Sequence, residues 1–327
     1  EETASWTEVV EDLTWINGGK GFTWKSDRTG WLHLYLVSSD GKALKQVTRG
    51  AFEVVESLGI DEESEYAYFI ASPENPTQRY LYRTRIEGQG VMERLSPENE
   101  TGHHQYTISP DKKYAIHTFS NHSNPPVTDI VSLKDHNVIR TLEDNNALKE
   151  KFANLDIQRK EFFRIPIEDS LLLDAYIIKP PDFDPDKKYP VIFYVYGEPA
   201  GTTVQDRWSG NDMWDYFLSQ QGYIVISVDN RGTKVPRGRE WKESIYKKIG
   251  IVAPFDQAAA ARYIMQKYDC IDKNRIGIWG WSGGGSMTLN CMFRFPEIYK
   301  TGVAVAFVSN QKFYDSFYQE RYMGQVE

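Results

Sequence analysis

Hydrophobic and polar residues follow two different patterns in the two halves of the chain. In the second half, short apolar runs alternate with segments of helical spacing, and the runs cover residues 191–196, 223–228, 276–279 and 302–308. The clearest helical segment lies between the second and third runs, at residues 252–268. Apolar strands that alternate with helices are typical of a mostly parallel sheet covered on both faces. We therefore predict an α/β domain over residues 161–327.

The first half consists of short alternating runs separated by polar turns. Three similar runs begin at Trp31, Tyr66 and Tyr114, with spacings of 35 and 48 residues. These spacings are close to the repeat of about 40–50 residues in a β-propeller whose blades have four strands. We predict a partial β-propeller over residues 1–160, with about three to four blades. Because closure of a propeller needs about 4–8 blades, we expect further blades upstream of this chain.

The most specific motif follows the third apolar run and has the sequence Gly280-Trp281-Ser282-Gly283-Gly284. A G-x-S-x-G sequence between a strand and a helix is the nucleophile elbow of an α/β-hydrolase, and its glycines make room for a sharp turn. The alternative is a glycine-rich turn with an incidental serine. We predict that Ser282 is a nucleophile that forms an acyl intermediate.

A serine hydroxyl needs a neighbouring base, and in this fold the acid and the histidine follow the nucleophile in the chain. The six histidines all precede Ser282, the last of them being His136, and 45 residues follow the serine. The chain therefore has a nucleophile without its base. We expect the triad aspartate and histidine, and the last strands of the domain, beyond residue 327. The 327-residue piece alone is predicted to be inactive.

Acyl transfer also needs hydrogen-bond donors at the position where the oxyanion develops. The first apolar run ends at Tyr196, before a glycine and a proline, and Gly283 follows the serine. We predict that the Tyr196 phenol and the Gly283 backbone N–H supply these donors. The alternative for Tyr196 is an ordinary packed aromatic residue.

Four segments of the second half resemble the prolyl oligopeptidase family of serine peptidases, and the last of them resembles its dipeptidyl peptidase IV branch. They are Tyr196-Gly197-Glu198-Pro199, the elbow, residues 227–233 (Ser-Val-Asp-Asn-Arg-Gly-Thr) and residues 314–324 (Tyr-Asp-Ser-Phe-Tyr-Gln-Glu-Arg-Tyr-Met-Gly). The resemblance covers roughly residues 160–327. It implies an α/β-hydrolase domain, C-terminally incomplete in this chain, preceded by the last blades of a β-propeller.

The resemblance also implies roles for individual residues. Ser282 is the acylated nucleophile, and Tyr196 and the Gly283 amide hold the oxyanion. Tyr314 and Tyr318 match residues that wall a small pocket for proline, and Val308 matches a further pocket residue. A flat apolar slot suits a pyrrolidine ring, which has aliphatic faces and no N–H. Without the resemblance, core packing would be the preferred interpretation of both tyrosines.

Three positions depart from the pattern of the branch. Gly283 and Gln311 stand where an aromatic residue is usual, and Glu198 stands where a second small residue is usual. The first change is expected to widen the pocket. Alanine or another small residue is therefore an alternative to proline at the penultimate position of the substrate.

Composition limits the classes of partner. A net charge of −8 argues against nucleic acid, because phosphate binding requires a basic face. No apolar run approaches the roughly 20 residues of a membrane span. The two cysteines, Cys270 and Cys291, give no disulfide framework, and no spacing indicates a metal site or a cofactor. The resemblance implies a periplasmic or extracellular enzyme. It also implies a possible homodimer, because members of the family often dimerise.

The resulting functional hypothesis is a serine exopeptidase that releases dipeptides from peptides with a free N-terminus, with proline or alanine at the penultimate position. Besides a lipase-like esterase, which the propeller half argues against, two alternatives remain open. One is another peptidase of the family, such as an acylaminoacyl peptidase or an oligopeptidase. The other is a non-catalytic propeller and hydrolase protein that binds a partner, which the missing histidine favours.

Overall fold

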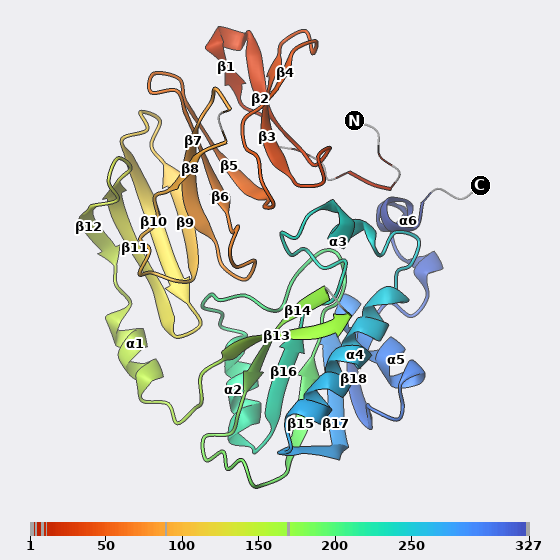
Figure 1. The fold of residues 1–327 in the computed structure, drawn as a ribbon. Helices are drawn as coiled ribbons and strands as arrows, with labels where there is room; N and C mark the ends of the chain where they lie inside the picture. The colour runs from red at the N-terminus through yellow and green to blue at the C-terminus, as the bar shows by residue number, and fades with distance from the viewer. Residues whose placement is uncertain are drawn as a thin grey trace.

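The structure is a computed structural model that describes residues 3, 5–7, 10, 12–88, 90–168 and 171–324. Three antiparallel sheets of four strands each form the first part (Figure 1). A sheet of six strands with helices on its faces forms the second part. Short antiparallel sheets therefore precede an α/β sheet along the chain, as the predicted fold class requires.

The three small sheets follow one another along the chain, and each is a simple meander. The first contains β1 (Trp15–Ile16), β2 (Gly21–Ser26), β3 (His33–Ser38) and β4 (Leu44–Gln46). The second contains β5 (Val54–Asp61), β6 (Tyr66–Ala71), β7 (Tyr80–Arg85) and β8 (Met92–Arg94). The third contains β9 (His103–Ile108), β10 (Tyr114–Asn121), β11 (Asn124–Ser132) and β12 (Val138–Glu143). No part of a fourth blade lies among the described residues.

The repeat has a different register from the one read off the sequence. The runs at Tyr66 and Tyr114 are second strands of their sheets, whereas the run at Trp31 leads into β3, a third strand. The equivalent second strand in the first sheet is β2, which begins at Gly21, so the true spacings are 45 and 48 residues. The sequence misled because β2 mixes apolar with polar residues, while β3 places its buried residues consecutively.

Neighbouring small sheets pack face to face through the two faces of the middle one. Phe69 of β6 packs with Val54 and Leu34 toward the first sheet. Its neighbours Tyr68 and Ile70 pack toward the third sheet. Successive side chains of a strand point to opposite faces, so one strand can serve both contacts.

The large sheet has the strand order β13-β14-β16-β15-β17-β18. The four strands β16, β15, β17 and β18 are parallel, and β13 and β14 extend them in antiparallel pairing. Among the described strands, β18 pairs with β17 alone. The strands are β13 (Glu161–Glu168), β14 (Leu171–Ile178), β15 (Tyr189–Tyr194), β16 (Ile224–Val228), β17 (Ile271–Trp281) and β18 (Thr301–Val305).

Helices cover both faces of this sheet. Ile226 points toward α4 and α5, whereas its neighbour Val225 packs with Tyr216 of α2 on the opposite face. The α-helices are α1 (Asn146–Ala153), α2 (Asp212–Gln220), α3 (Arg239–Glu243), α4 (Val252–Lys267), α5 (Gly283–Arg294) and α6 (Ser316–Met323). Single 3-10 turns are at Asn17–Gly19 and Gln311–Phe313.

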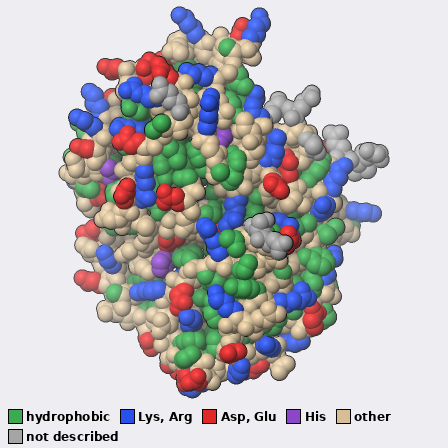
Figure 2. All heavy atoms as spheres, in the orientation of Figure 1, with side chains coloured by type: hydrophobic (Ala, Val, Ile, Leu, Met, Phe, Trp, Pro, Cys, Tyr) green, Lys and Arg blue, Asp and Glu red, His purple; other side chains and the backbone are tan. Residues whose placement is uncertain are grey.

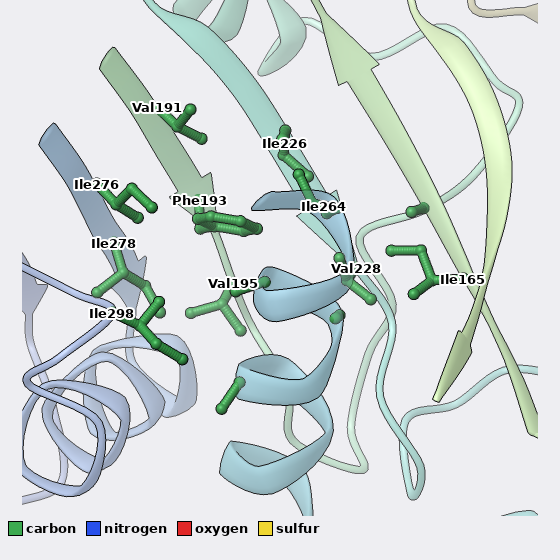
Figure 3. Close-up of a cluster of buried hydrophobic side chains, with 14 of the residues drawn as sticks. Ile165, Val191, Phe193, Val195, Ile226, Val228, Ile264, Ile276, Ile278 and Ile298 are labelled. Atoms are coloured by element: carbon green, nitrogen blue, oxygen red, sulfur yellow. The ribbon is translucent and has the colours of Figure 1, made fainter. Parts of the chain in front are cut away.

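The main core lies between the sheet and helix α4. Figure 3 shows Val191, Phe193 and Val195 of β15 and its extension beside Ile278 of β17, all directed toward the helices. Each of these four residues is at most 2% exposed. Burial of such a side chain stabilises the fold by about 1.5–3 kcal/mol. This core fixes the carboxyl ends of β15 and β17, where the candidate nucleophile lies.

Charged groups join the two parts of the molecule. Arg239 at the start of α3 pairs with Asp27 after β2, at 2.9 Å. The Gly238 amide donates to Glu53, a buried residue directly before β5 of the second small sheet. Asp206 accepts from His122 of the third sheet at 2.8 Å. These contacts hold the small sheets above the carboxyl edge of the large sheet (Figure 1).

The viewed surface carries interspersed acidic and basic side chains (Figure 2). Within the part of the chain that the structure describes, no helix is both long enough and apolar enough to cross a membrane.

Candidate active site

Ser282 lies on a strained turn between β17 and α5. Its backbone has φ 56° and ψ −118°, a conformation that non-glycine residues rarely adopt. The Ser282 amide donates to the Val305 carbonyl at 2.9 Å, and its own carbonyl accepts from Ser286 at 3.1 Å. Such strain persists where the surrounding structure holds it, and it is the geometry expected of a nucleophile elbow.

The glycines on either side allow α5 to approach β15. A Cβ at Gly284 would lie 2.2 Å from the Val195 carbonyl oxygen, and one at Gly280 would lie 2.4 Å from the same atom. This oxygen is a backbone atom, which cannot move aside without shifting the strand. The motif therefore specifies close packing of helix on strand as well as the turn.

Tyr196 follows β15 and lies beside the elbow. The next residue, Gly197, has φ +73°, and a Cβ there would meet Met287 of α5 at 2.8 Å. The Gly197 carbonyl accepts from Asn230 at 3.0 Å, and Gln257 of α4 in turn donates to Asn230 at 3.0 Å. The turn that presents Tyr196 is thus held by a buried amide chain.

Asp229, Asn230 and Arg231 belong to one of the segments that resemble the family, and each of them holds a neighbouring loop or helix. Asp229 accepts from the backbone amides of Thr203 and Val204. Arg231 forms a two-pronged pair with Asp256 of α4, with a shortest distance of 2.7 Å. The segment therefore braces the loops around Tyr196, a positioning role that sequence spacing does not reveal.

A small pocket of about 30 Å³ lies at the elbow and brings the predicted residues together. Its walls include the predicted nucleophile and all five predicted companions, which are Ser282, Tyr196, Gly283, Val308, Tyr314 and Tyr318. Glu198, Ser286 and Gln311 complete the lining. The structure therefore gathers all six predicted residues at one site, and their roles in catalysis and binding stay predictions.

The two pocket tyrosines are positioned by helix α6. Asp315 caps this helix by accepting a hydrogen bond from the Tyr318 amide at 2.7 Å. The rings of Tyr314 and Tyr318 meet edge to face at 5.3 Å, and Tyr318 packs on Tyr322 at 4.9 Å. Tyr322 in turn contacts Trp6 near the start of the chain, at 5.0 Å.

Val308 lies beyond the strand in which the sequence placed it. The apolar run 302–308 suggested a longer strand, but β18 ends at Val305. Ala306 has a positive φ of 47°, which turns the chain out of the sheet. The Ser286 hydroxyl then holds Val308 by accepting from its amide at 3.0 Å and donating to its carbonyl at 3.2 Å. Ser286 is thus a supporting residue that the sequence did not identify.

Glu198 occupies the space next to Gly283. A Cβ at Gly283 would lie 2.3 Å from Glu198 Cγ. The departure at Gly283 therefore does not widen the pocket as the sequence suggested, because the glutamate fills the volume instead. The Glu198 side chain is buried, and its carboxyl group accepts a short hydrogen bond from the Tyr318 hydroxyl.

Burial controls the charge states of these groups. Burial raises the pKa of Glu198 above its ordinary value, against the lowering effect of the Tyr318 hydrogen bond. Burial also raises the pKa of Tyr196, and the nearby Glu198 carboxyl adds to the increase. A phenol with a raised pKa stays protonated, so Tyr196 keeps the O–H that an oxyanion donor needs.

No histidine lines this pocket among the described residues. All six histidines belong to the small sheets and their loops, and four of them have the following partners in the small sheets or, for His122, in the α/β part. His33 contacts Thr48, His104 contacts His117, His136 contacts Tyr106, and His122 contacts Asp206.

One group of possible metal ligands lies outside the site. Ligand atoms of Glu100, His104 and His117 lie within 4.8 Å of one another in the third small sheet. The His104 nitrogens already bond to His117 at 2.9 Å and to the Glu100 backbone carbonyl at 2.9 Å. The Nδ1 atom of His117 is buried and has no hydrogen-bond partner among the described residues.

The large sheet, its helices and the strained serine turn define the α/β-hydrolase fold with its nucleophile elbow. A family model described as the dipeptidyl peptidase IV N-terminal region matches residues 1–126. A second, described as the prolyl oligopeptidase family, matches residues 211–327. The chain belongs to the prolyl oligopeptidase family, and within it to the dipeptidyl peptidase IV branch.

Individual relatives extend this result over the whole chain. The chain is 34% identical to a dipeptidyl peptidase 4 of Arthroderma otae and 33% identical to one of Trichophyton equinum, each over 331 residues. The crystal structure of Porphyromonas gingivalis dipeptidyl peptidase 4 matches with a TM-score of 0.88 and 37% identity, over 95% of this chain and 43% of that one. The two matches to curated relatives cover 99% of this chain and 42% of each relative.

Proposed function

We propose that the protein containing this chain is a serine exopeptidase that releases dipeptides from the free N-terminus of peptides. The penultimate residue is proline or alanine. The observation that carries the proposal is the pocket beside the elbow, where Ser282, Tyr196, Tyr314 and Tyr318 converge. The relatives named dipeptidyl peptidase 4 support the same assignment.

In the proposed reaction, the Ser282 hydroxyl attacks the carbonyl that follows the second residue of the peptide. The Tyr196 O–H and the Gly283 N–H donate to the oxyanion. As the first residue of α5, Gly283 has an N–H without a partner inside the helix. The shortened peptide leaves as an amine, and water then hydrolyses the acyl-enzyme to release the dipeptide.

The aspartate and histidine of the triad are proposed to come from outside residues 1–327. None of the chain's histidines lies at the pocket, so Ser282 lacks a base among the described residues. The 327-residue chain by itself is therefore proposed to be inactive. An acidic pair that grips the substrate's ammonium group is likewise proposed to belong to the rest of the protein. The family resemblance also suggests a periplasmic or extracellular location.

The test uses the full-length protein and fluorogenic Gly-Pro and Ala-Ala amides, each with a free and with an acetylated N-terminus. We expect turnover of the free peptides and loss of turnover in the Ser282→Ala variant. Equal or faster turnover of acetylated peptides would instead indicate an acylaminoacyl peptidase of the same family.

A second candidate function is a non-catalytic binding protein, which the absence of a histidine beside Ser282 favours. A fluorophosphonate distinguishes the two, because it labels only an activated serine. Labelling of full-length protein at Ser282 would exclude the binding protein. Absence of both labelling and turnover would support it.

A further inference from the structure

We propose that Glu198 determines specificity in this pocket, and that it favours a small penultimate side chain with a hydroxyl group over an apolar one of the same size. Serine is the preferred case. The inference rests on the proposed function, because it assigns a substrate class to the same site. It starts from the position of one carboxyl group.

Glu198 is a wall of the pocket beside Ser282, so a side chain bound there lies near it. Its Cγ packs against Gly283, directly after the nucleophile. The residue is 7% exposed, so the surrounding protein leaves little water around the carboxyl group. Its position is fixed at both ends, by Gly283 beside the stem and by the Tyr318 hydroxyl at Oε2.

One carboxyl oxygen remains available to a ligand. Among the described residues, the side-chain hydrogen bond to this carboxyl group comes from the Tyr318 hydroxyl, which donates to Oε2. Two of the other polar walls have partners. The Ser286 hydroxyl holds the Val308 backbone, and the Gln311 side-chain oxygen accepts from Gln319. Oε1 of Glu198 is thus an acceptor that the hydroxyl of a substrate side chain can meet, beside the Tyr196 and Tyr314 hydroxyls.

An apolar side chain would cover this oxygen without giving it a partner. Leaving a buried polar group unpaired is costly, and a site built to bond a hydroxyl discriminates against the analogue that lacks it. A hydroxyl can donate to an ionised carboxylate and accept from a protonated carboxyl group. The pairing therefore survives the raised pKa of Glu198 in either protonation state.

The size of the pocket limits the class further. About 30 Å³ of it is open to the centre of a water-sized sphere, more than the roughly 10–15 Å³ that one water needs. A small side chain therefore suits this space better than a long cationic one. Serine has one heavy atom more than alanine, and this atom is a hydroxyl that can reach the Glu198 carboxyl group. Serine and alanine substrates therefore give the sharpest comparison.

The experiment measures kcat/KM of the full-length protein for Ala-Ser and Ala-Ala amides that share one fluorogenic leaving group. Ala-Thr and Ala-Val amides form a second pair, whose penultimate side chains are isosteric. We expect the serine substrate to be favoured about tenfold, the effect of one good hydrogen bond. In Glu198→Met the ratio falls to about one, and Glu198→Gln, which keeps hydrogen-bonding atoms, retains a preference of several-fold.

The outcomes separate this inference from the proposed function. If neither dipeptide is released and Ser282 resists fluorophosphonate labelling, the proposed function fails. If Ala-Ala is released but wild-type protein shows no preference for serine, only the role of Glu198 is overturned. An unchanged preference in Glu198→Met overturns it as well. If Glu198→Met does not fold, the serine-to-alanine ratios of kcat/KM in wild-type protein and in Glu198→Gln decide. Glu297→Gln changes a surface carboxyl group and is the control, so it must leave this ratio unaltered.

Discussion

Glu198 and Gly283 share one volume beside the nucleophile. The Glu198 Cγ lies 2.3 Å from the position that a Cβ of residue 283 would take. The two departures from the usual pattern of the branch are therefore one exchange, in which a side chain after Tyr196 replaces one after Ser282. The exchange keeps the pocket filled and gives it a carboxyl wall.

This exchange predicts a strong coupling between the two positions. Gly283→Ala should lower the free energy of unfolding by about 1–3 kcal/mol, because the methyl group overpacks against Glu198. Gly283 does not have a positive φ, so the cost comes from the clash rather than from the backbone. In the Glu198→Gly background the same substitution should be tolerated, with a coupling energy of about 0.5–3 kcal/mol. Denaturant unfolding of the four proteins of the cycle measures this, and additive effects would refute the shared volume.

Removal of the phenol hydroxyl tests the role proposed for Tyr196. In full-length protein, Tyr196→Phe should lower kcat about 10²–10³-fold with little change in KM, because the donor acts mainly on the oxyanion. Tyr194→Phe is the matched control, because Tyr194 stacks on Trp279 instead of lining the pocket. A change in KM alone for Tyr196→Phe would indicate a binding role only.

Asn230 should act on catalysis through the turn that holds Tyr196. Asn230→Ala removes the bond to the Gly197 carbonyl and leaves buried groups unpaired, so stability should fall by about 1–3 kcal/mol. The rate of fluorophosphonate labelling of Ser282 in full-length protein should also fall, under conditions where the variant remains folded. Asn137→Ala, at an exposed loop amide paired with Asp135, is the control and should change neither quantity. Loss of stability with normal labelling would show that Asn230 is only structural.

The third small sheet should lose stability in acid. Burial lowers the pKa of His104 to about 4 and that of His117 to about 2, from an ordinary value near 6.5. The unfolded chain therefore binds protons below pH 6.5 that the folded chain rejects, and stability falls as the pH decreases. For His104 alone the loss at pH 5 is about 2 kcal/mol.

Two carboxyl groups act in the opposite direction. Burial raises the pKa of Asp215 and of Asp229 to about 6, so these groups favour the folded state at low pH and lose that contribution as the pH rises from about 4 to 6. Urea unfolding at pH 7.5 and pH 5, in wild-type protein and in His104→Gln, separates the contributions. A pH dependence that His104→Gln leaves unchanged would contradict the histidine account.

The sequence predicted the parts of the fold whose local patterns are strong. The strands β15, β16 and β17 and helix α4 appear at the apolar runs and the helical segment, because strands buried on both faces are continuously apolar, whereas β18 ends at Val305, three residues before its run does. The elbow was predictable because its glycines meet backbone atoms, so the motif follows directly from sterics. The register of the propeller repeat was mistaken at β2, where half-buried strands give a weaker signal.

The supporting residues of the site were not predictable in the same way. Ser286 and Asn230 matter because of partners far away in the sequence, Val308 and Gly197 respectively. The pairing of Glu198 with Gly283 joins residues 85 positions apart and depends on the close approach of β15 to α5. Such contacts are properties of the tertiary structure, and single-sequence patterns carry no record of them.

The most direct test of the account is to trap the acyl-enzyme. Full-length protein is mixed with excess Ala-Ala ester, quenched in acid and digested, and the peptide that contains Ser282 is analysed by mass spectrometry. The account predicts that this peptide gains the mass of one Ala-Ala acyl group, and that Ser282→Ala abolishes the adduct and the release of Ala-Ala. Turnover without any adduct at Ser282, or undiminished turnover by Ser282→Ala, would contradict it.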